Sequence, residues 1–129
     1  MIQNWATYDW PVVRRGDAVL QIRWKAPIST TNTTLTTVDL SAYSGRMHCE
    51  VWTHDATGAR DAKVGDASIV NVDLAIGRFN IVLGKTLTAA LPVDRAAFYD
   101  LLFDEPSPST YDTYRLSGRI IGIEGQSEP

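Results

Sequence analysis

Two histidines and a glutamate on one short segment come nearest to a chemical site in this sequence. His48, Glu50 and His54 fall on the same face of a segment whose polarity alternates as in a β-strand, and two imidazoles with a carboxylate can bind zinc. On a strand, however, residues six positions apart lie about 20 Å from each other. His48 and His54 cannot reach one ion unless the strand bends sharply, so we expect no metal site.

The serine, threonine and acidic residues form no recognisable catalytic set. Hydrolysis needs paired carboxylates, or a nucleophile beside a histidine base. The serines and threonines lie in predicted turns and linkers, and neither histidine adjoins a glycine-elbow nucleophile. Asp100 and Asp104 could meet other carboxylates in space, which sequence spacing does not show. We therefore expect a binding or structural protein without a cofactor, and no enzyme.

Four large aromatic residues are the candidates for an interface. Trp5, Tyr8 and Trp10 cluster in a short, otherwise polar N-terminal segment that Pro11 interrupts, and Trp52 lies on the polar face of its predicted strand. Aromatic side chains of this size are enriched at protein interfaces. The alternative for the N-terminal cluster is burial against the edge of the domain's own core. Trp52 is therefore the cleaner candidate.

Length and charge narrow the class of protein. The 129 residues fit one domain, and the lone Cys49 can form no intramolecular disulfide, which favours synthesis in a reducing compartment. The 12 basic and 15 acidic residues are mixed along the chain, without the basic stripe that phosphate binding needs. No stretch approaches the ~20 apolar residues of a membrane-spanning helix. We expect neither nucleic acid nor a membrane as a partner.

Short segments of alternating polarity, separated by turn signals, predict an all-β fold. In one of them Met47, Cys49 and Val51 share an apolar face, and in another Tyr99, Leu101 and Phe103 face inward. The predicted strands cover residues 19–25, 46–53, 68–74, 78–83, 98–103 and 114–123, with a less regular one at 8–14. Strands of this length and spacing are typical of a small sandwich or barrel.

The connections between these strands have their own signals. Segments 68–74 and 78–83 are predicted to form a hairpin around Gly77. Each strand would present one apolar face to the same core, and these faces contain Val70, Val72 and Leu74 in the first strand and Phe79, Ile81 and Leu83 in the second. The Thr-rich residues 27–37 predict a mobile loop or an extended arm, residues 55–66 a surface loop, and residues 86–91 one helical turn. Gly118 and Gly122, inside the last strand, indicate a bulge or the close approach of another backbone.

Six stretches, in one order, carry a resemblance to a known family. They are Arg15-Gly16-Asp17, Val38-Asp39-Leu40-Ser41 with Ser44-Gly45-Arg46-Met47, Gly77-Arg78-Phe79, Leu87-Thr88-Ala89-Ala90-Leu91, Tyr99-Asp100-Leu101 and Arg115-Leu116-Ser117-Gly118. Over about residues 12–124 the chain resembles the Ig-like domain at the N-terminus of the baseplate upper protein of tailed bacteriophages, which also occurs in short phage tail proteins. The resemblance implies an Ig-like β-sandwich of about seven short, mostly antiparallel strands. Residues 1–129 would form this single domain, with an N-terminal arm at 1–11 and a frayed tail at 125–129.

The resemblance also implies a function that depends on surfaces. It indicates a structural virion protein, made in the host cytoplasm and present in several copies, which serves in the tail or baseplate as an adaptor that organises neighbouring virion proteins or receptor-binding fibres. Strand edges, the N-terminal aromatic segment, the Thr-rich tract and Trp52 would supply the contacts. Two alternatives stay open: a capsid decoration or cement protein, and a module that binds host glycan by stacking Trp52 on a sugar ring.

Overall fold

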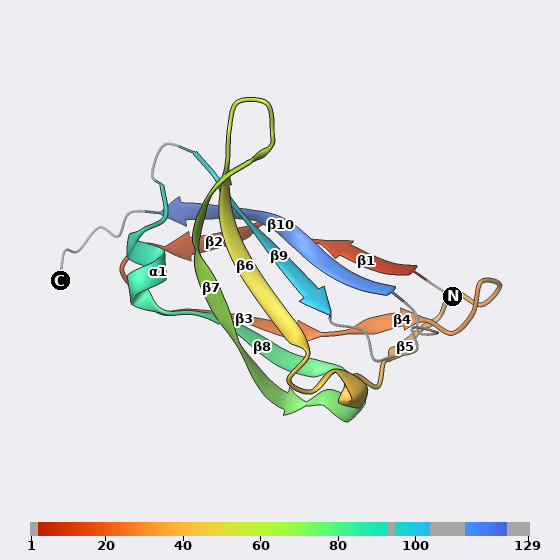
Figure 1. Ribbon diagram of the computed structural model, residues 1–129. Helices are drawn as coiled ribbons and strands as arrows, with labels where there is room; N and C mark the ends of the chain where they lie inside the picture. The colour runs from red at the N-terminus through yellow and green to blue at the C-terminus, as the bar shows by residue number, and fades with distance from the viewer. Residues whose placement is uncertain (1–2, 93–94, 104–112, 124–129) are drawn as a thin grey trace.

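The computed structural model describes residues 3–92, 95–103 and 113–123, which form a mostly β structure (Figure 1). The elements in chain order are β1 (Gln3–Thr7), β2 (Trp10–Val13), β3 (Ala18–Arg23), β4 (Lys25–Pro27), β5 (Leu35–Thr37), a 3-10 turn (Ser41–Tyr43), β6 (Met47–His54), β7 (Arg60–Asp73), a second 3-10 turn (Leu74–Ile76), β8 (Arg78–Leu83), α1 (Lys85–Ala89), β9 (Ala97–Phe103) and β10 (Thr113–Ile123). Residues 104–112, which include Asp104, and the predicted tail at 125–129 lie outside the described residues.

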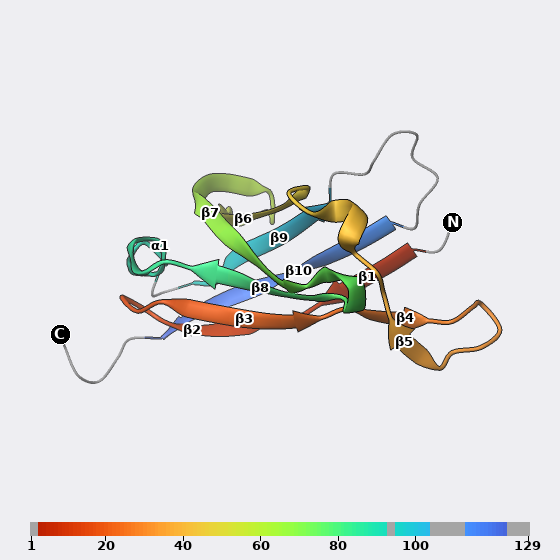
Figure 2. The ribbon, with the colours of Figure 1, turned by 90° about the horizontal axis from the view of Figure 1, so that it is seen from below.

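One mixed sheet contains all of these strands except β4 and β5. Its strand order is β1-β10-β9-β6-β7-β8-β3, and β2 follows β1 along the same edge of β10. β1 and β2 run parallel to β10, whereas the other neighbours are antiparallel. The sheet curls until it is nearly closed into a barrel (Figures 1 and 2). The predicted all-β class is confirmed, but the predicted two-sheet sandwich is wrong.

A single long strand turns the corner of this barrel and explains the error. β7 pairs with β6 as far as Ala67 and with β8 from Ser68 onward. The sequence predicts a loop over residues 55–66, yet the strand already begins at Arg60. The first residues of β7 are exposed on both faces, so their polar composition shows no alternation. With this segment in the ladder, the two halves of the structure share one continuous sheet.

The core lies inside the curled sheet and is built largely from the predicted inward faces. Met47, Cys49 and Val51 of β6 are buried, as are Phe79, Ile81 and Leu83 of β8 and Tyr99 and Leu101 of β9, while Phe103 packs against them. Full burial of one such side chain stabilises the fold by roughly 1.5–3 kcal/mol. Alternation therefore identified the core correctly in these strands.

The inward face of β7 is one residue away from the predicted one. Val70 and Val72 are 47% and 59% exposed, whereas Ile69 packs against the core. Ile69 is paired with the buried Ile81 of β8, and directly paired residues share a face of the sheet. A register shift near the end of β7 then returns Leu74 to the interior.

β4 and β5 form a separate hairpin, here called the arm (residues 25–37), which projects from the body (Figure 2). Of the two predictions for the Thr-rich tract, the extended arm is therefore the one found. At its base the N–H of Trp24 donates to the carbonyl of Gly77 at 2.7 Å, and the N–H of Val38 donates to the carbonyl of Trp24 at 3.3 Å. Gly77 has a φ of 74°, and a Cβ there would lie 2.6 Å from the Trp24 carbonyl oxygen, so this position requires glycine.

The N-terminal segment, expected to be an arm, contributes β1 and β2 to the sheet. Between them the chain kinks at Tyr8 and Asp9, where the N–H of Tyr8 donates to the carbonyl of Ser117 at 3.0 Å and the Tyr99 hydroxyl donates to the carbonyl of Tyr8 at 2.6 Å. A Cβ on Gly118 would lie 2.7 Å from the carbonyl carbon of Tyr8 and nearer still to its oxygen. The predicted close approach of another backbone at Gly118 is thus confirmed.

The turn between β2 and β3 is fixed against the start of α1. The N–H of Lys85 donates to Oδ1 of Asp17 at 3.0 Å, and the hydroxyl of Thr88 donates to the carbonyl of Gly16 at 2.7 Å. Arg15 adopts a φ of 68° in this turn. Asp17 thereby satisfies an N–H at the first turn of α1, which the helix cannot satisfy itself.

The same turn also holds the end of α1. Arg14 donates from Nε to the carbonyl of Leu91 at 3.0 Å and from Nη2 to the carbonyl of Ala89 at 2.8 Å. The Arg15-Gly16-Asp17 stretch and the Leu87–Leu91 stretch, far apart in sequence, therefore form one contact. We call the hydrogen bonds that join Arg14, Gly16 and Asp17 with residues 85–91 the clamp.

The clamp should carry measurable stability. Replacing the capping carboxylate in Asp17→Ala is expected to lower the free energy of unfolding by about 1 kcal/mol, the usual effect of losing a side-chain cap. Asp61→Ala, at an exposed position of β7, is the matched control and should change it by less than about 0.5 kcal/mol. Urea unfolding followed by tryptophan fluorescence measures both, and equal stabilities for the two variants would contradict the role of the clamp.

Gly118 should tolerate no side chain. In Gly118→Ala the added Cβ must push the Tyr8 carbonyl away, so we expect a loss of about 3 kcal/mol or more. Gly84→Ala is the control, because a Cβ at Gly84 meets no atom within 4 Å. Thermal unfolding of the two variants makes the comparison. A Gly118→Ala protein as stable as the control would show that the kink is not packed as described.

Candidate functional site

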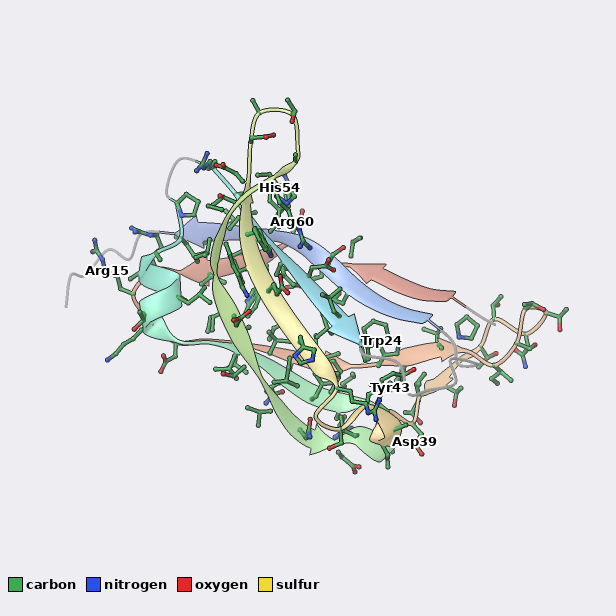
Figure 3. All side chains as sticks on the ribbon, viewed as in Figure 1. Arg15, Trp24, Asp39, Tyr43, His54 and Arg60 are labelled. Atoms are coloured by element: carbon green, nitrogen blue, oxygen red, sulfur yellow. The ribbon has the colours of Figure 1, made fainter. Side chains whose placement is uncertain are left out.

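A groove of about 460 Å³ on the outside of the sheet is the candidate site. Side chains of β6, β7, β9 and β10 line it, together with Gly58 of the β6–β7 loop and the kink between β1 and β2. Figure 3 shows His54 and Arg60 close together, where the β6–β7 hairpin leaves the body. The volume falls within the range of roughly 300–1,000 Å³ that is usual for small-ligand sites.

Strand register places a polar row on the outer face of the sheet, and Thr7, Ser117 and Asp100 of this row line the groove. Thr7, Ser117, Asp100, Glu50 and Asp66 are paired in turn across β1, β10, β9, β6 and β7. Three carboxylates therefore stand side by side on adjacent strands. Like charges directly opposite each other destabilise a sheet, so this row needs compensation by cations.

Arg60 provides much of this compensation. Its guanidinium lies 3.1 Å from Oδ2 of Asp100 and 3.9 Å from Oε2 of Glu50. It also lies over the Trp52 ring, 4.9 Å from the centroid, and the indole N–H of Trp52 donates to Oε2 of Glu50 at 2.8 Å. Although Arg60 is partly exposed, its position is fixed by two carboxylates and one aromatic face.

The next row on the same face contains two aromatic residues and an arginine, and we call it the aromatic row. Trp52, Phe98 and Arg119 are paired in turn across β6, β9 and β10. The ring of His54 stacks on Phe98 with centroids 3.8 Å apart and planes 7° apart, and both rings line the groove and are partly exposed. The β6–β7 pairing shifts register on either side of Trp52 and Thr53, and Gly58 at the end of this hairpin lines the groove.

The far wall is an ion pair at the N-terminal kink. Nη2 of Arg119 lies 2.7 Å from Oδ2 of Asp9, and the backbone N–H of Arg119 donates to Oδ1 at 3.3 Å. These hydrogen bonds lower the pKa of the Asp9 carboxyl and raise the pKa of Arg119. The pair is exposed, so its own contribution to stability is small.

The predicted interface residues lie in different environments. Trp52 lies in the groove. Tyr8 is 49% exposed, and its chain neighbours Thr7 and Asp9 line the groove. Trp10 is buried and packs edge-to-face on Tyr99 at 6.0 Å, so it belongs to the core. The backbone of Trp5 pairs with that of Arg115, and the Trp5 side chain lies outside the described residues.

Sequence reasoning missed the partners of Trp52. The alternation in β6 correctly placed Glu50, Trp52 and His54 on one outer face, but it gave no indication that Arg60 and Asp100 join them. The signal was present only in part: an acidic residue inside an apolar strand, as Asp100 is, requires a cation nearby.

A second, smaller groove of about 250 Å³ lies on the β3–β8 part of the sheet, next to Val72. Gln21, Arg23, Arg78 and Asn80 supply most of its polar groups. It holds no aromatic ring and no carboxylate, which makes it a useful contrast to the first groove.

Within residues 3–92, 95–103 and 113–123, no group of three His, Cys, Asp or Glu side chains is arranged to hold a metal ion. Over the same residues, no helix has the length and apolar character to cross a membrane.

Comparisons with known proteins give no family assignment. No model of a known protein family matches the chain, and no curated protein matches it significantly.

The burial of Cys49 and Tyr99 should affect the pH dependence of stability. Burial, and then the charges of Asp100, Asp66 and Glu50, raise the pKa of the Cys49 thiol from 9.0 to about 12, and burial also raises the pKa of the Tyr99 hydroxyl. The unfolded thiol loses its proton near pH 9, while the folded one keeps it. The free energy of unfolding should therefore fall above pH 9, by up to about 1.4 kcal/mol per pH unit for each such proton.

Urea titrations between pH 8 and pH 11 measure this slope. Cys49→Ala should reduce the slope by one proton, whatever it does to the absolute stability. A wild-type stability that is constant from pH 8 to pH 11 would contradict the buried, protonated state of both groups.

Proposed function

We propose that this chain is a structural protein of a tailed-phage virion, a tail or baseplate adaptor that organises neighbouring virion proteins or receptor-binding fibres. The six ordered stretches that resemble baseplate upper proteins support this class of protein. The nearly closed barrel departs from the sandwich that the resemblance implies, so the proposal rests on these stretches and on two structural features, the arm and the edge strand β1.

The arm has the properties of a docking element. It carries two exposed apolar side chains, Ile28 at 54% and Leu35 at 61% exposure, outside the body of the protein. Its turn is ordered by the Ser29 hydroxyl, which accepts the N–H groups of Thr31 at 3.3 Å and Asn32 at 3.0 Å. A preformed element that presents apolar side chains can bind a neighbour without a large loss of conformational entropy.

Edge strands offer a second kind of contact. In the described residues β1 pairs with β10 alone, which leaves its other side available to an extended segment of a neighbour. Addition of a strand to an exposed sheet edge is a common mode of protein assembly. Several copies in one particle would multiply such individually weak contacts.

The test is capture of virion proteins by the purified chain. Tagged protein is first sized by light scattering and then mixed with disrupted particles of a phage that encodes it, and captured proteins are identified by mass spectrometry. We expect a discrete oligomer or the capture of a tail or baseplate protein. A strict monomer that captures no virion protein would contradict the proposal, and capture of the capsid protein would favour the decoration alternative.

The contribution of the arm is tested in the same assay. Ile28→Ser with Leu35→Ser should reduce capture at least about tenfold, since both substitutions remove an exposed apolar side chain that a bound neighbour would cover. Val70→Ser with Val72→Ser, on the outer face of β7, is the control, because it also removes two exposed apolar side chains. Equal capture by both double variants would remove the arm from the proposal.

A further inference from the structure

We infer that the groove on β6, β9 and β10 binds a neutral saccharide. The inference goes beyond the virion proposal and is independent of it, because a free binding module could use the same groove. It rests on how the charges, rings and shape of the groove are combined.

The charges of the groove are already paired with one another. Arg60 is held by Asp100, and Arg119 is held by Asp9 at 2.7 Å. A pair of opposite charges has no net charge, so a charged ligand that approaches it meets a like charge beside every opposite charge. The arrangement therefore favours a ligand without net charge.

A hydroxylated ligand can use both members of the exposed Arg119–Asp9 pair without separating them. A guanidinium has five N–H donors and a carboxylate about four acceptor sites, so this pair keeps hydrogen-bonding capacity after its internal contacts are made. A hydroxyl group both donates and accepts, and neighbouring hydroxyls of a sugar can therefore bridge a carboxylate and its guanidinium. Hydrogen bonds to charged groups are also stronger than those between neutral groups.

The aromatic row gives the apolar surface that a sugar ring also needs. The stacked His54 and Phe98 rings lie beside Trp52, whose ring is covered by Arg60 and whose N–H is engaged by Glu50. Because one face of Trp52 is occupied by the guanidinium, the C–H face of a sugar is expected to contact the His54–Phe98 stack. This contact differs from the one expected from the sequence, in which the sugar ring stacks on Trp52.

Preorganisation and size support the same ligand class. Asp100 is only 8% exposed although it lies on the outer face of the sheet, and the pairing of strands fixes it relative to Trp52, Phe98 and Arg119. The groove volume of about 460 Å³ suits one or two sugar rings. Fixed polar groups around a small apolar platform bind a ligand with little reorganisation.

The experiment is a saturation-transfer NMR screen of the folded chain. The neutral probes are oligosaccharides of glucose, galactose, rhamnose and N-acetylglucosamine, and the anionic probes are sialylated and uronic-acid oligosaccharides. We expect a neutral probe to bind at millimolar concentration or below. If no neutral probe binds in this range, or if the anionic probes bind more tightly, the inference is wrong.

Variants then locate the binding. Arg119→Ala and His54→Ala remove a hydrogen-bonding group and a stacking ring at partly exposed positions, and each should weaken binding at least about tenfold. Arg78→Ala, in the second groove, is the matched control and should leave affinity unchanged. Circular dichroism verifies that all three remain folded. Unchanged affinity in both groove variants would overturn the assignment even if a sugar binds.

Discussion

The clamp between the β2–β3 turn and α1 is the interaction on which the rest of the fold depends. β2 and β3 occupy opposite ends of the strand order, so the turn that joins them bridges the seam of the barrel. α1 connects β8 to β9, strands on the two sides of the corner in β7. Hydrogen bonds between Arg14, Gly16 and Asp17 and the two ends of α1 thus connect the seam to the helix. They hold the curl of the sheet, and with it the core.

The outer face carries an electrostatic cost to stability. A sheet selected for stability alone would not place Asp66, Glu50 and Asp100 in one row, because their mutual repulsion costs free energy. Arg60 and Lys63 offset this cost, with Lys63 lying 2.8 Å from Asp66. The outcome is a surface whose charged groups are held in place before any ligand arrives. Such local conflicts are typical of functional sites.

The sequence predicted the parts of the structure that depend on alternation within one strand. The inward faces of β6, β8 and β9 follow from such alternation, and so does the outer placement of Trp52. It failed where both faces of a strand are exposed, as at Arg60, and where pairing sets the face, as at Ile69. The groove could not be predicted, because Asp9 and Arg119 meet only through the parallel pairing of the N-terminal segment with β10.

The parallel arrangement of β1, β2 and β10 also determines how the protein responds to force. β1 begins at Gln3 and β10 ends at Ile123, and because the strands run in the same direction these points lie at opposite ends of the shared ladder (Figure 1). A pull applied between them slides the strands along each other and strains every hydrogen bond of the ladder together. Bonds that share tension in this way resist far better than bonds opened one after another. The body can therefore transmit mechanical tension along its long axis without its sheet being peeled apart.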